Sequence, residues 1–302
     1  MQEVLAAVAD RWRRLDPLLP SPRPWAPEVP VLAVPGAVGV PNHRVPEPGA
    51  PLPMWFAAHG FTLRPLVADL EVGPALDRLL TDWSAGIAEP AAAAGADSAA
   101  YVFVPSRDTD TFLPLARHGL TAYVVIAARR PGYPNLPVGP AKVRQATPAD
   151  LDTVAALALT QARHETPFAT TYERPTAAEQ IRAEADRALQ TPERWVWLAE
   201  VDGAAVGLLI GTPPAQNEWL ASYTDARPVA YVAVAWVDPV ARSAGVGAAL
   251  AAAAHQAFDN AGIGLTLLHY SMVNPRSVPF WHRLGYRPLW TGWQARPATR
   301  LS

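Results

Sequence analysis

The sequence predicts an α/β protein with a mixed sheet flanked by helices, arranged as a tandem of two domains. Three observations lead to this fold class. The chain has 302 residues, which is longer than one domain usually needs. Its C-terminal half alternates apolar, β-branched runs with helical patterns, as α/β folds do. A stretch rich in proline and glycine, residues 131–140, lies near the middle of the chain and predicts a linker.

The N-terminal half has less regular patterns. A helical pattern covers residues 1–20, and prolines are dense from Pro17 to Pro53, which predicts extended or looped chain. Apolar spacing and flanking glycines then predict four elements: a helix over 73–95, a strand over 98–104, a short helix over 111–118 and a strand over 122–128.

Past the linker, the pattern predicts a second domain, so we expect domains at residues 1–139 and 140–302. Thr147-Pro148-Ala149-Asp150 has the form of a capped helix start, and Asp202-Gly203 predicts a hairpin. The expected elements are a strand at 142–145, helices from 148 to 163 and 176 to 191, strands at 195–200, 204–211 and 229–237, a helix at 248–260, a strand at 265–272, a helix at 277–283 and a strand at 289–294.

The most informative motif, called here the glycine loop, is Arg242-Ser243-Ala244-Gly245-Val246-Gly247. It lies between a predicted strand and a predicted helix, where free backbone N–H groups and the helix dipole favour an anion. A dinucleotide-binding turn needs a third glycine where Leu250 stands, and a triphosphate loop needs a lysine after its last glycine. The only lysine is Lys142, so both of these interpretations fail.

A second motif narrows the ligand. The glycine loop, within Val237-x-Pro239-x-x-Arg242-x-x-Gly245-x-Gly247-x-x-Leu250, resembles the acyl-CoA pyrophosphate loop of the GNAT superfamily of N-acyltransferases. Asn274-Pro275-Arg276-Ser277-Val278-Pro279-Phe280-Trp281-His282-Arg283-Leu284-Gly285-Tyr286 resembles a second signature of that family, in the expected order. The resemblance implies an acetyl-CoA-dependent N-acetyltransferase, with acetyl-CoA as co-substrate and direct attack by an amine in a ternary complex.

The resemblance also implies which residues bind the co-substrate. Backbone groups of Trp236 and Val237 would pair with the pantetheine arm, Asn274 with its amide, and Phe280 would pack beneath it. Backbone N–H groups from Ser243 to Ala248 would hold the pyrophosphate. The expected cofactor-binding residues are Trp236, Val237, Arg242, Ser243, Ala244, Gly245, Val246, Gly247, Ala248, Asn274, Phe280 and Trp281.

The catalytic groups depart from the family pattern. Trp281 stands where many members carry a tyrosine that protonates the leaving thiolate, and an indole is no useful acid near neutral pH. The strand before the glycine loop holds no Glu, Asp or His before Asp238. His269, on the following strand, is the first candidate for the base because it titrates in the right range. Glu165 and His164 are further candidates on the acceptor side, together with Tyr172 and Tyr223; deprotonation through water is an alternative.

The N-terminal half is identified as a degenerate GNAT-like domain. The interval from Asp108 to Gly119 equals that from Asn274 to Gly285, but an Arg-x-x-Gly-x-Gly loop does not precede it. We therefore expect this half to shape the acceptor site rather than to bind a second CoA. An unrelated α/β accessory domain is the alternative.

Composition limits the partners. The net charge is −2, which does not favour nucleic acid or an acidic membrane surface. Cysteine is absent and the seven histidines show no metal-ligand spacing. We expect a cytoplasmic enzyme, with a homodimer left open, whose acceptor is an amine of a small molecule or peptide. The alternatives are a CoA-binding regulatory or interaction protein without turnover, and an acyltransferase that uses a longer acyl-CoA, admitted by Ala233 and Ala235.

Overall fold

The structure is a computed structural model that describes residues 2–47, 49–134 and 136–302. Met1, Pro48 and Asn135, from the predicted helix, proline-rich stretch and linker, lie outside the described residues. The chain folds into two compact units. Unit 1 comprises residues up to 126, 222–225 and 288–302, and unit 2 comprises 127–221 and 226–287. The predicted division into domains 1–139 and 140–302 stays a prediction.

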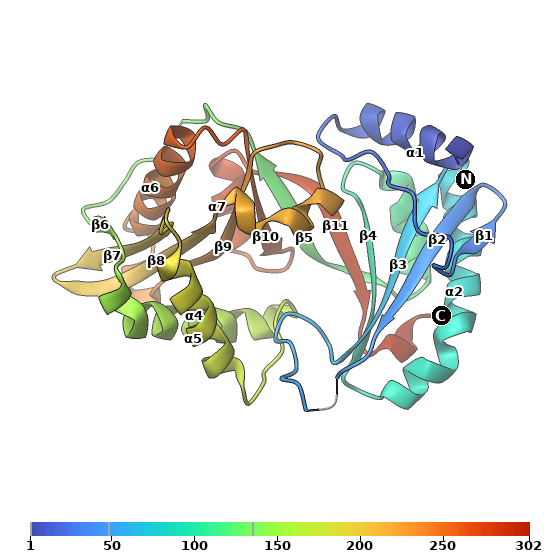
Figure 1. The fold of residues 1–302 in the computed structure, drawn as a ribbon, viewed down its shortest axis with the longest axis horizontal. Coiled ribbons are helices and arrows are strands. Elements are labelled where there is room, and N and C mark those ends of the chain that lie inside the picture. The colour runs from blue at the N-terminus through green and yellow to red at the C-terminus, as the bar shows by residue number, and fades with distance from the viewer. Residues whose placement is uncertain (1, 48, 135) are drawn as a thin grey trace. The chain divides into compact units, whose positions relative to one another are not determined.

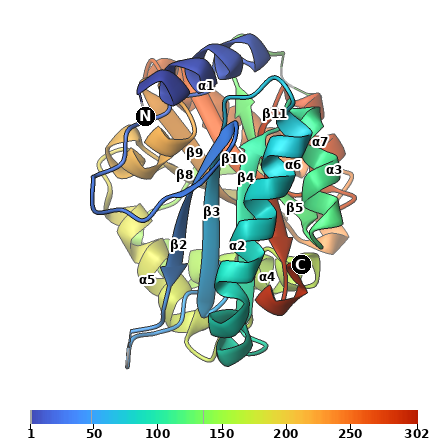
Figure 2. The same cartoon turned by 90° about the vertical axis from the view of Figure 1, so that its right-hand side faces the viewer.

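Unit 1 is a mixed sheet with helices packed on it. Its strands follow the order β1-β2-β3-β4-β11, in which β3 and β4 are parallel and the other pairs antiparallel. In Figure 2, α2 runs along β2 and β3. The elements are α1 (Gln2–Leu15), β1 (Leu32–Val34), β2 (Ala37–Arg44), β3 (His59–Val67), α2 (Val72–Ala94), β4 (Ser98–Pro105), α3 (Phe112–Arg117) and β11 (Arg287–Ala295).

The core of unit 1 lies between α2 and the sheet. One face of α2 is buried at helical spacing, with Leu76, Leu79 and Trp83 at most 1% exposed. These side chains belong to one apolar cluster with Phe61 of β3 and Val102 of β4. At about 25 cal/mol per Å² of apolar surface removed from water, this burial is the main stabilising contribution to the unit.

The proline-rich segment, predicted to be extended or looped chain, contains two strands, β1 and β2. β1 is short, and its ladder with β2 covers only Leu32↔Gly39 to Val34↔Ala37. Pro41 lies beyond that ladder, opposite Leu63 of β3. A proline is tolerated there because it lacks only the N–H that a second neighbouring strand would need. The strand β3 also had no sequence prediction.

Unit 2 contains a further run of strands, also of mixed direction, with helices on both faces. Its strand order is β10-β9-β8-β7-β6, and only β9 and β10 are parallel. Figure 1 shows α6 on one face and α4 with α5 on the other. The elements are β6 (Lys142–Gln145), α4 (Leu151–Glu165), α5 (Ala177–Gln190), β7 (Val196–Val201), β8 (Ala204–Thr212), β9 (Val229–Val237), α6 (Val246–Asn260), β10 (Leu265–Ser271) and α7 (Ser277–Arg283).

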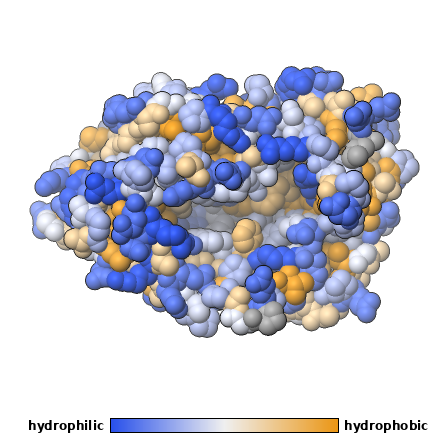
Figure 3. Space-filling model, in the orientation of Figure 1, coloured by the Kyte–Doolittle hydropathy of each residue, from blue (hydrophilic) through white to orange (hydrophobic). Residues whose placement is uncertain are grey.

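The helices and strands predicted after residue 72 are confirmed, with ends that differ by at most three residues. β5 (Thr121–Arg129), which carries the chain from unit 1 into unit 2, is among them. The hairpin at Asp202-Gly203 has φ values of 50° and 80°, as a turn with two left-handed residues requires. Much of the visible surface over α4 and α5 is hydrophilic (Figure 3). In the described ranges, none of the helices has the length and apolar character needed to cross a membrane.

An ion-pair network ties the start of α4 to the sheet of unit 2. Arg144 on β6 donates to both carboxylate oxygens of Asp150, at 2.9 and 2.7 Å, and to Glu200 of β7 at 2.7 Å. Asp150 also accepts bonds from the N–H and the hydroxyl of Thr147, which forms the predicted capping box. The Arg144 guanidinium, with these Thr147 donors, holds the pKa of Asp150 well below its usual range.

We predict that Asp150→Asn lowers the free energy of unfolding at pH 7 by about 1 to 2 kcal/mol, through the cap and the ion pair. The folded-state pKa of Asp150 is depressed. Its contribution to stability is therefore present above the unfolded-state pKa and is lost as the pH falls from that pKa through the folded-state pKa. Urea unfolding between pH 7 and pH 3 should show a smaller loss for the variant than for the wild type. The control is Asp152→Asn, at an exposed ion pair; equal losses in all three proteins would contradict the prediction.

Candidate active site

The site begins where two parallel strands separate. The ladder between β9 and β10 runs from Val229↔Leu265 to Val232↔Leu268, whereas β9 continues to Val237. Over 234–237 the described pairing of β9 is with β8 alone, and a register shift in that ladder falls between Ile210 and Gly211. Over these residues, the backbone edge of β9 that does not face β8 is without a described strand partner. This edge can pair with an extended ligand.

The glycine loop joins this strand to α6. Gly245 is the N-cap of α6 with a φ of 77°, and a Cβ there would lie 2.3 Å from the backbone nitrogen of Gly139. Glycine is therefore required by both conformation and space. The bond from Ala249 N to Gly245 O starts the helical ladder, so the N–H groups of the first turn are left for a ligand. These groups carry the positive end of the helix dipole.

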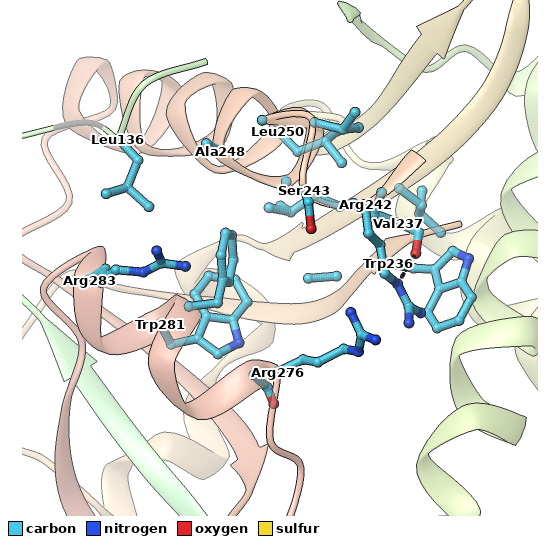
Figure 4. A pocket seen from close by; sticks show the side chains of 18 of the residues that line it. Leu136, Trp236, Val237, Arg242, Ser243, Ala248, Leu250, Arg276, Trp281 and Arg283 are labelled. Atoms are coloured by element: carbon cyan, nitrogen blue, oxygen red, sulfur yellow. Dashed lines mark hydrogen bonds between the residues drawn. The ribbon is translucent and has the colours of Figure 1, made fainter. Parts of the chain in front are cut away.

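A pocket of about 550 Å³ in unit 2 connects the loop with the free edge of β9. Its walls come from the ends of β8 and β9, the glycine loop with α6, α7, the end of α4, and the linker (Figure 4). The lining residues are Leu136, Pro137, His164, Glu165, Leu208, Leu209, Ala235, Trp236, Val237, Arg242, Ser243, Gly245, Val246, Gly247, Ala248, Leu250, Asn274, Arg276, Ser277, Phe280, Trp281 and Arg283.

Three arginines make the pocket electropositive. Arg242, Arg276 and Arg283 line it, against one carboxylate, Glu165, among its described lining residues. Arg242 donates from Nε to the carbonyl oxygen of Val237 at 2.9 Å and lies 4.8 Å from the ring centre of Trp236. Burial, followed by the charge of Arg276, lowers the pKa of Arg242. Like charges held together beside a helix N-terminus favour an anionic ligand.

Glu165 and Asn274 are linked in the pocket wall. Asn274 donates from Nδ2 to Glu165 at 3.0 Å, and the hydroxyl of Thr170 donates to the other carboxylate oxygen at 3.1 Å. Burial raises the pKa of Glu165, and these two hydrogen bonds oppose the rise. The side-chain oxygen of Asn274 accepts from the N–H groups of Arg276 and Ser277. Asn274 therefore orients both the start of α7 and the carboxylate.

His164 is the second proton acceptor in the wall. Its ring centre lies 5.1 Å from that of Trp236, in an edge-to-face arrangement. Burial lowers the pKa of His164, and Arg242 and Arg276 lower it further. The imidazole is therefore neutral at pH 7. His164 and Glu165 place two groups that can accept a proton beside the free edge of β9.

His269 lies outside this pocket lining. Its Nδ1 is 2.8 Å from the hydroxyl of Tyr231, and the ring of Trp219 stacks on it at 5.9 Å. Burial lowers its pKa to about 4. Tyr223 belongs to unit 1, whereas Tyr172 is buried in unit 2 with Arg174 over its ring. These three residues are not among the described lining residues of the pocket, and their roles stay predictions.

The predicted ligand residues converge, with Ala244 the exception. Eleven of the twelve line the pocket, whereas Ala244 packs against Gly139. Trp281 is 6% exposed and packs between Phe280 and Tyr286. Eight lining residues had no predicted role: Leu136, Pro137, Leu208, Leu209, Leu250, Arg276, Ser277 and Arg283. Arg276 and Arg283 lie inside the second motif, and their positive charge was the feature of the sequence that could have indicated a role in binding an anion. Within the described residues, His, Asp and Glu do not form a group suited to a metal.

Comparisons with known proteins agree with this geometry. Residues 158–286 match the acetyltransferase (GNAT) family model. The structure is similar to a GCN5-related N-acetyltransferase from Sphaerobacter thermophilus, with 13% identity, a TM-score of 0.59, and coverage of 87% of this chain and 77% of that one. It is also similar to a GNAT-family acetyltransferase from Colwellia psychrerythraea, with 10% identity, a TM-score of 0.50 and 77% coverage of both chains. At these identities the likeness concerns the fold, and it extends into the N-terminal half. No curated protein matches the chain.

We predict that Glu165 titrates above its ordinary pKa of 4.5, because burial disfavours the charged carboxylate. Asn274→Asp should raise this pKa further, since it removes the Nδ2 donor and adds a negative charge while keeping an oxygen to cap α7. A carbon-13 NMR titration of the glutamate carboxyl groups measures both values. Asn260→Asp, exposed at the end of α6, adds the same charge elsewhere and is the control. A Glu165 midpoint at or below 4.5 would contradict the prediction.

Proposed function

Because the C-terminal half of this chain carries a GNAT-family acetyltransferase domain at residues 158–286, we propose that it is an acetyl-CoA-dependent N-acetyltransferase. The acceptor is an amine of a small molecule or peptide. The observation that carries the proposal is one pocket that joins an anion site at the N-terminus of α6 to the free edge of β9. A ligand that fits both features carries a diphosphate at the helix N-terminus and an extended, amide-bearing arm along the strand, as acyl-CoA does.

Donor binding uses backbone groups and charge together. The N–H groups from Ser243 to Ala248 are assigned to the diphosphate, and Arg276 lies across the pocket from the loop (Figure 4). The edge of β9 at Trp236 and Val237 is assigned to the pantetheine arm. Phe280 supports this placement, since its ring would lie 3.3 Å from a Cβ at Gly247 and so covers the space beside the loop. The side chain of Arg242, now bonded to the Val237 carbonyl, would turn toward the diphosphate.

The chemistry needs a base for the acceptor. The amine nitrogen bonds to the thioester carbonyl carbon, the C–S bond breaks, and the proton of the nitrogen passes to the protein or to water. We assign the proton to Glu165, because it lines the pocket and burial raises its pKa toward the working range. Its negative charge also favours a cationic amine. The thiolate leaves without help from Trp281, at a pKa close to that of ordinary thiols.

His269 is the alternative base. It lies on β10 beyond the last pair of the β9–β10 ladder, and its low pKa leaves it neutral and able to accept a proton. The hydroxyl of Tyr231 would have to relay the proton, because it is bonded to Nδ1. Glu165 is preferred because it needs no relay.

Trp281 favours a second candidate function, a CoA-binding regulatory or interaction protein without turnover. Trp281 has an indole in place of an acidic hydroxyl, and β9 has no Glu, Asp or His before Asp238. A protein that binds CoA without catalysis needs neither group. A longer acyl group is a further option, since the small side chain of Ala235 lines the pocket. Release of free CoA thiol coupled to acylation of an amine distinguishes an enzyme from a protein that only binds CoA. A series of acyl-CoA donors with acyl chains of increasing length tests which acyl group is transferred.

We predict that Gly247→Glu abolishes CoA binding. The new carboxylate would stand among the N–H groups of the glycine loop, and like charges at a binding site cost several kcal/mol, about 100-fold or more in affinity. Calorimetry measures the affinity, and circular dichroism checks that the fold is retained. The control is Gly86→Glu, at an exposed position in α2 where a Cβ meets open space. Normal CoA affinity in Gly247→Glu would mean that the anion site is elsewhere.

We predict that Glu165→Gln lowers the turnover number by about 100-fold or more, the usual contribution of a general base, and leaves CoA affinity equal or higher. In the wild type, turnover should rise with pH through the raised pKa of Glu165, because the base works when deprotonated; the variant should lose this limb. A thiol-release assay with a panel of amines measures both. Comparison with His269→Gln decides the base: a loss confined to the histidine variant would exclude Glu165.

A further inference from the structure

The linker between the two predicted domains is fastened to one wall of the pocket. Arg129, 3% exposed, donates from Nε to the carbonyl oxygen of Leu284 at 3.0 Å and from Nη2 to that of Tyr133 at 3.3 Å. The ring of Tyr133 lies against Gly285, where a Cβ would be 2.3 Å from it. The first end of the linker therefore lies against the C-terminal end of α7, where the second motif ends.

The other end of the linker is fastened to the glycine loop. A Cβ on Gly139 would lie 1.6 Å from the carbonyl oxygen of Ala244, and a Cβ on Gly245 would meet the backbone of Gly139. Between these two attachments, Leu136 and Pro137 line the pocket. We call residues 132–134 and 136–140 the strap, since they run from α7 to the glycine loop along the pocket.

A cation without an acidic partner faces the same part of the pocket. In Figure 4, Arg283 and Leu136 lie at one end, and Trp236 with Arg242 at the other. Arg283 donates from Nε to the carbonyl oxygen of Pro279 at 3.3 Å. Among the described residues it makes no ion pair, so its remaining N–H groups can bind an anion. This end of the pocket thus has an apolar surface from the strap and a free guanidinium.

The inference rests on the proposed function. The direction in which the bound CoA runs decides which part of it lies at the end of the pocket with Leu136 and Arg283. With the diphosphate at the glycine loop and the pantetheine arm along β9 toward Trp236, the nucleotide must extend the opposite way. We propose that Leu136 and Pro137 of the strap, together with Arg283, form the nucleotide subsite: the first two pack on the adenine ring, and Arg283 pairs with the 3′-phosphate of the ribose. The strap thereby makes the linker part of the donor site.

Three ligands separate the two contacts. CoA carries both the adenine and the 3′-phosphate, 3′-dephospho-CoA lacks the phosphate, and 4′-phosphopantetheine lacks the nucleotide. Calorimetry on the full chain should give a wild-type preference for CoA over 3′-dephospho-CoA of about tenfold, as expected for one charge-assisted contact. Arg283→Gln should remove this preference by weakening CoA alone. Arg187→Gln, at an exposed arginine of α5, is the charge-matched control and should keep the preference.

The strap contact has its own variant. Leu136→Ser should weaken CoA and 3′-dephospho-CoA alike, by about fivefold, through the lost apolar contact, and leave 4′-phosphopantetheine unchanged. Val138→Ser, 59% exposed on the same strap and outside the pocket lining, is the control and should change none of the three affinities. Equal weakening of all three ligands by Leu136→Ser would show a structural effect on the pocket and overturn the adenine contact.

The failures of the two proposals are distinguishable. A wild type that binds CoA and transfers acetyl groups, but binds 3′-dephospho-CoA equally well, overturns the subsite alone. A preference that persists in Arg283→Gln also overturns it. A wild type that binds none of the three ligands overturns the proposed function and the subsite together.

Discussion

The early end of the ladder between β9 and β10 is the constraint on which the site depends. Two parallel strands that stayed paired to their ends would satisfy each other's backbone groups and leave no edge for a ligand. Here the last pair is Val232↔Leu268, and β9 continues to the glycine loop. The loop can follow immediately because Gly245 takes a left-handed conformation against the backbone of Gly139. A free strand edge and a helix N-terminus are thereby set in one pocket.

Positively and negatively charged side chains lie in different parts of the pocket around this strand edge. Arginines from the glycine loop and from α7 face the space beside the N-terminus of α6, whereas Glu165, the one carboxylate among the described lining residues, comes from the end of α4. Asn274 connects the two regions, because it orients Glu165 through Nδ2 and the start of α7 through its oxygen. An anionic donor and a carboxylate can therefore be held in separate parts of one site, with the arginines beside the donor.

Local patterns allowed much of the fold and the ligand site to be predicted from the sequence. The hairpin at Asp202-Gly203, the capping box at Thr147 and the glycine loop each follow from residues that are neighbours in the chain. β1 to β3 could not be predicted, because they are short or proline-containing and depend on distant partners. The contribution of Leu136 and Pro137 depends on the path of the linker, which buried contacts such as that of Arg129 with Leu284 determine. The orientation of His269 toward Tyr231 likewise depends on the β9–β10 register, which the strand pattern does not contain.

A crystal structure of the full chain with CoA tests the central claim most directly. We predict one CoA per chain, with diphosphate oxygens within hydrogen-bond distance of the N–H groups between Ser243 and Ala248 and the pantetheine arm along the edge of β9 at Trp236 and Val237. A diphosphate bound away from the N-terminus of α6, or a CoA held only by unit 1, would contradict it.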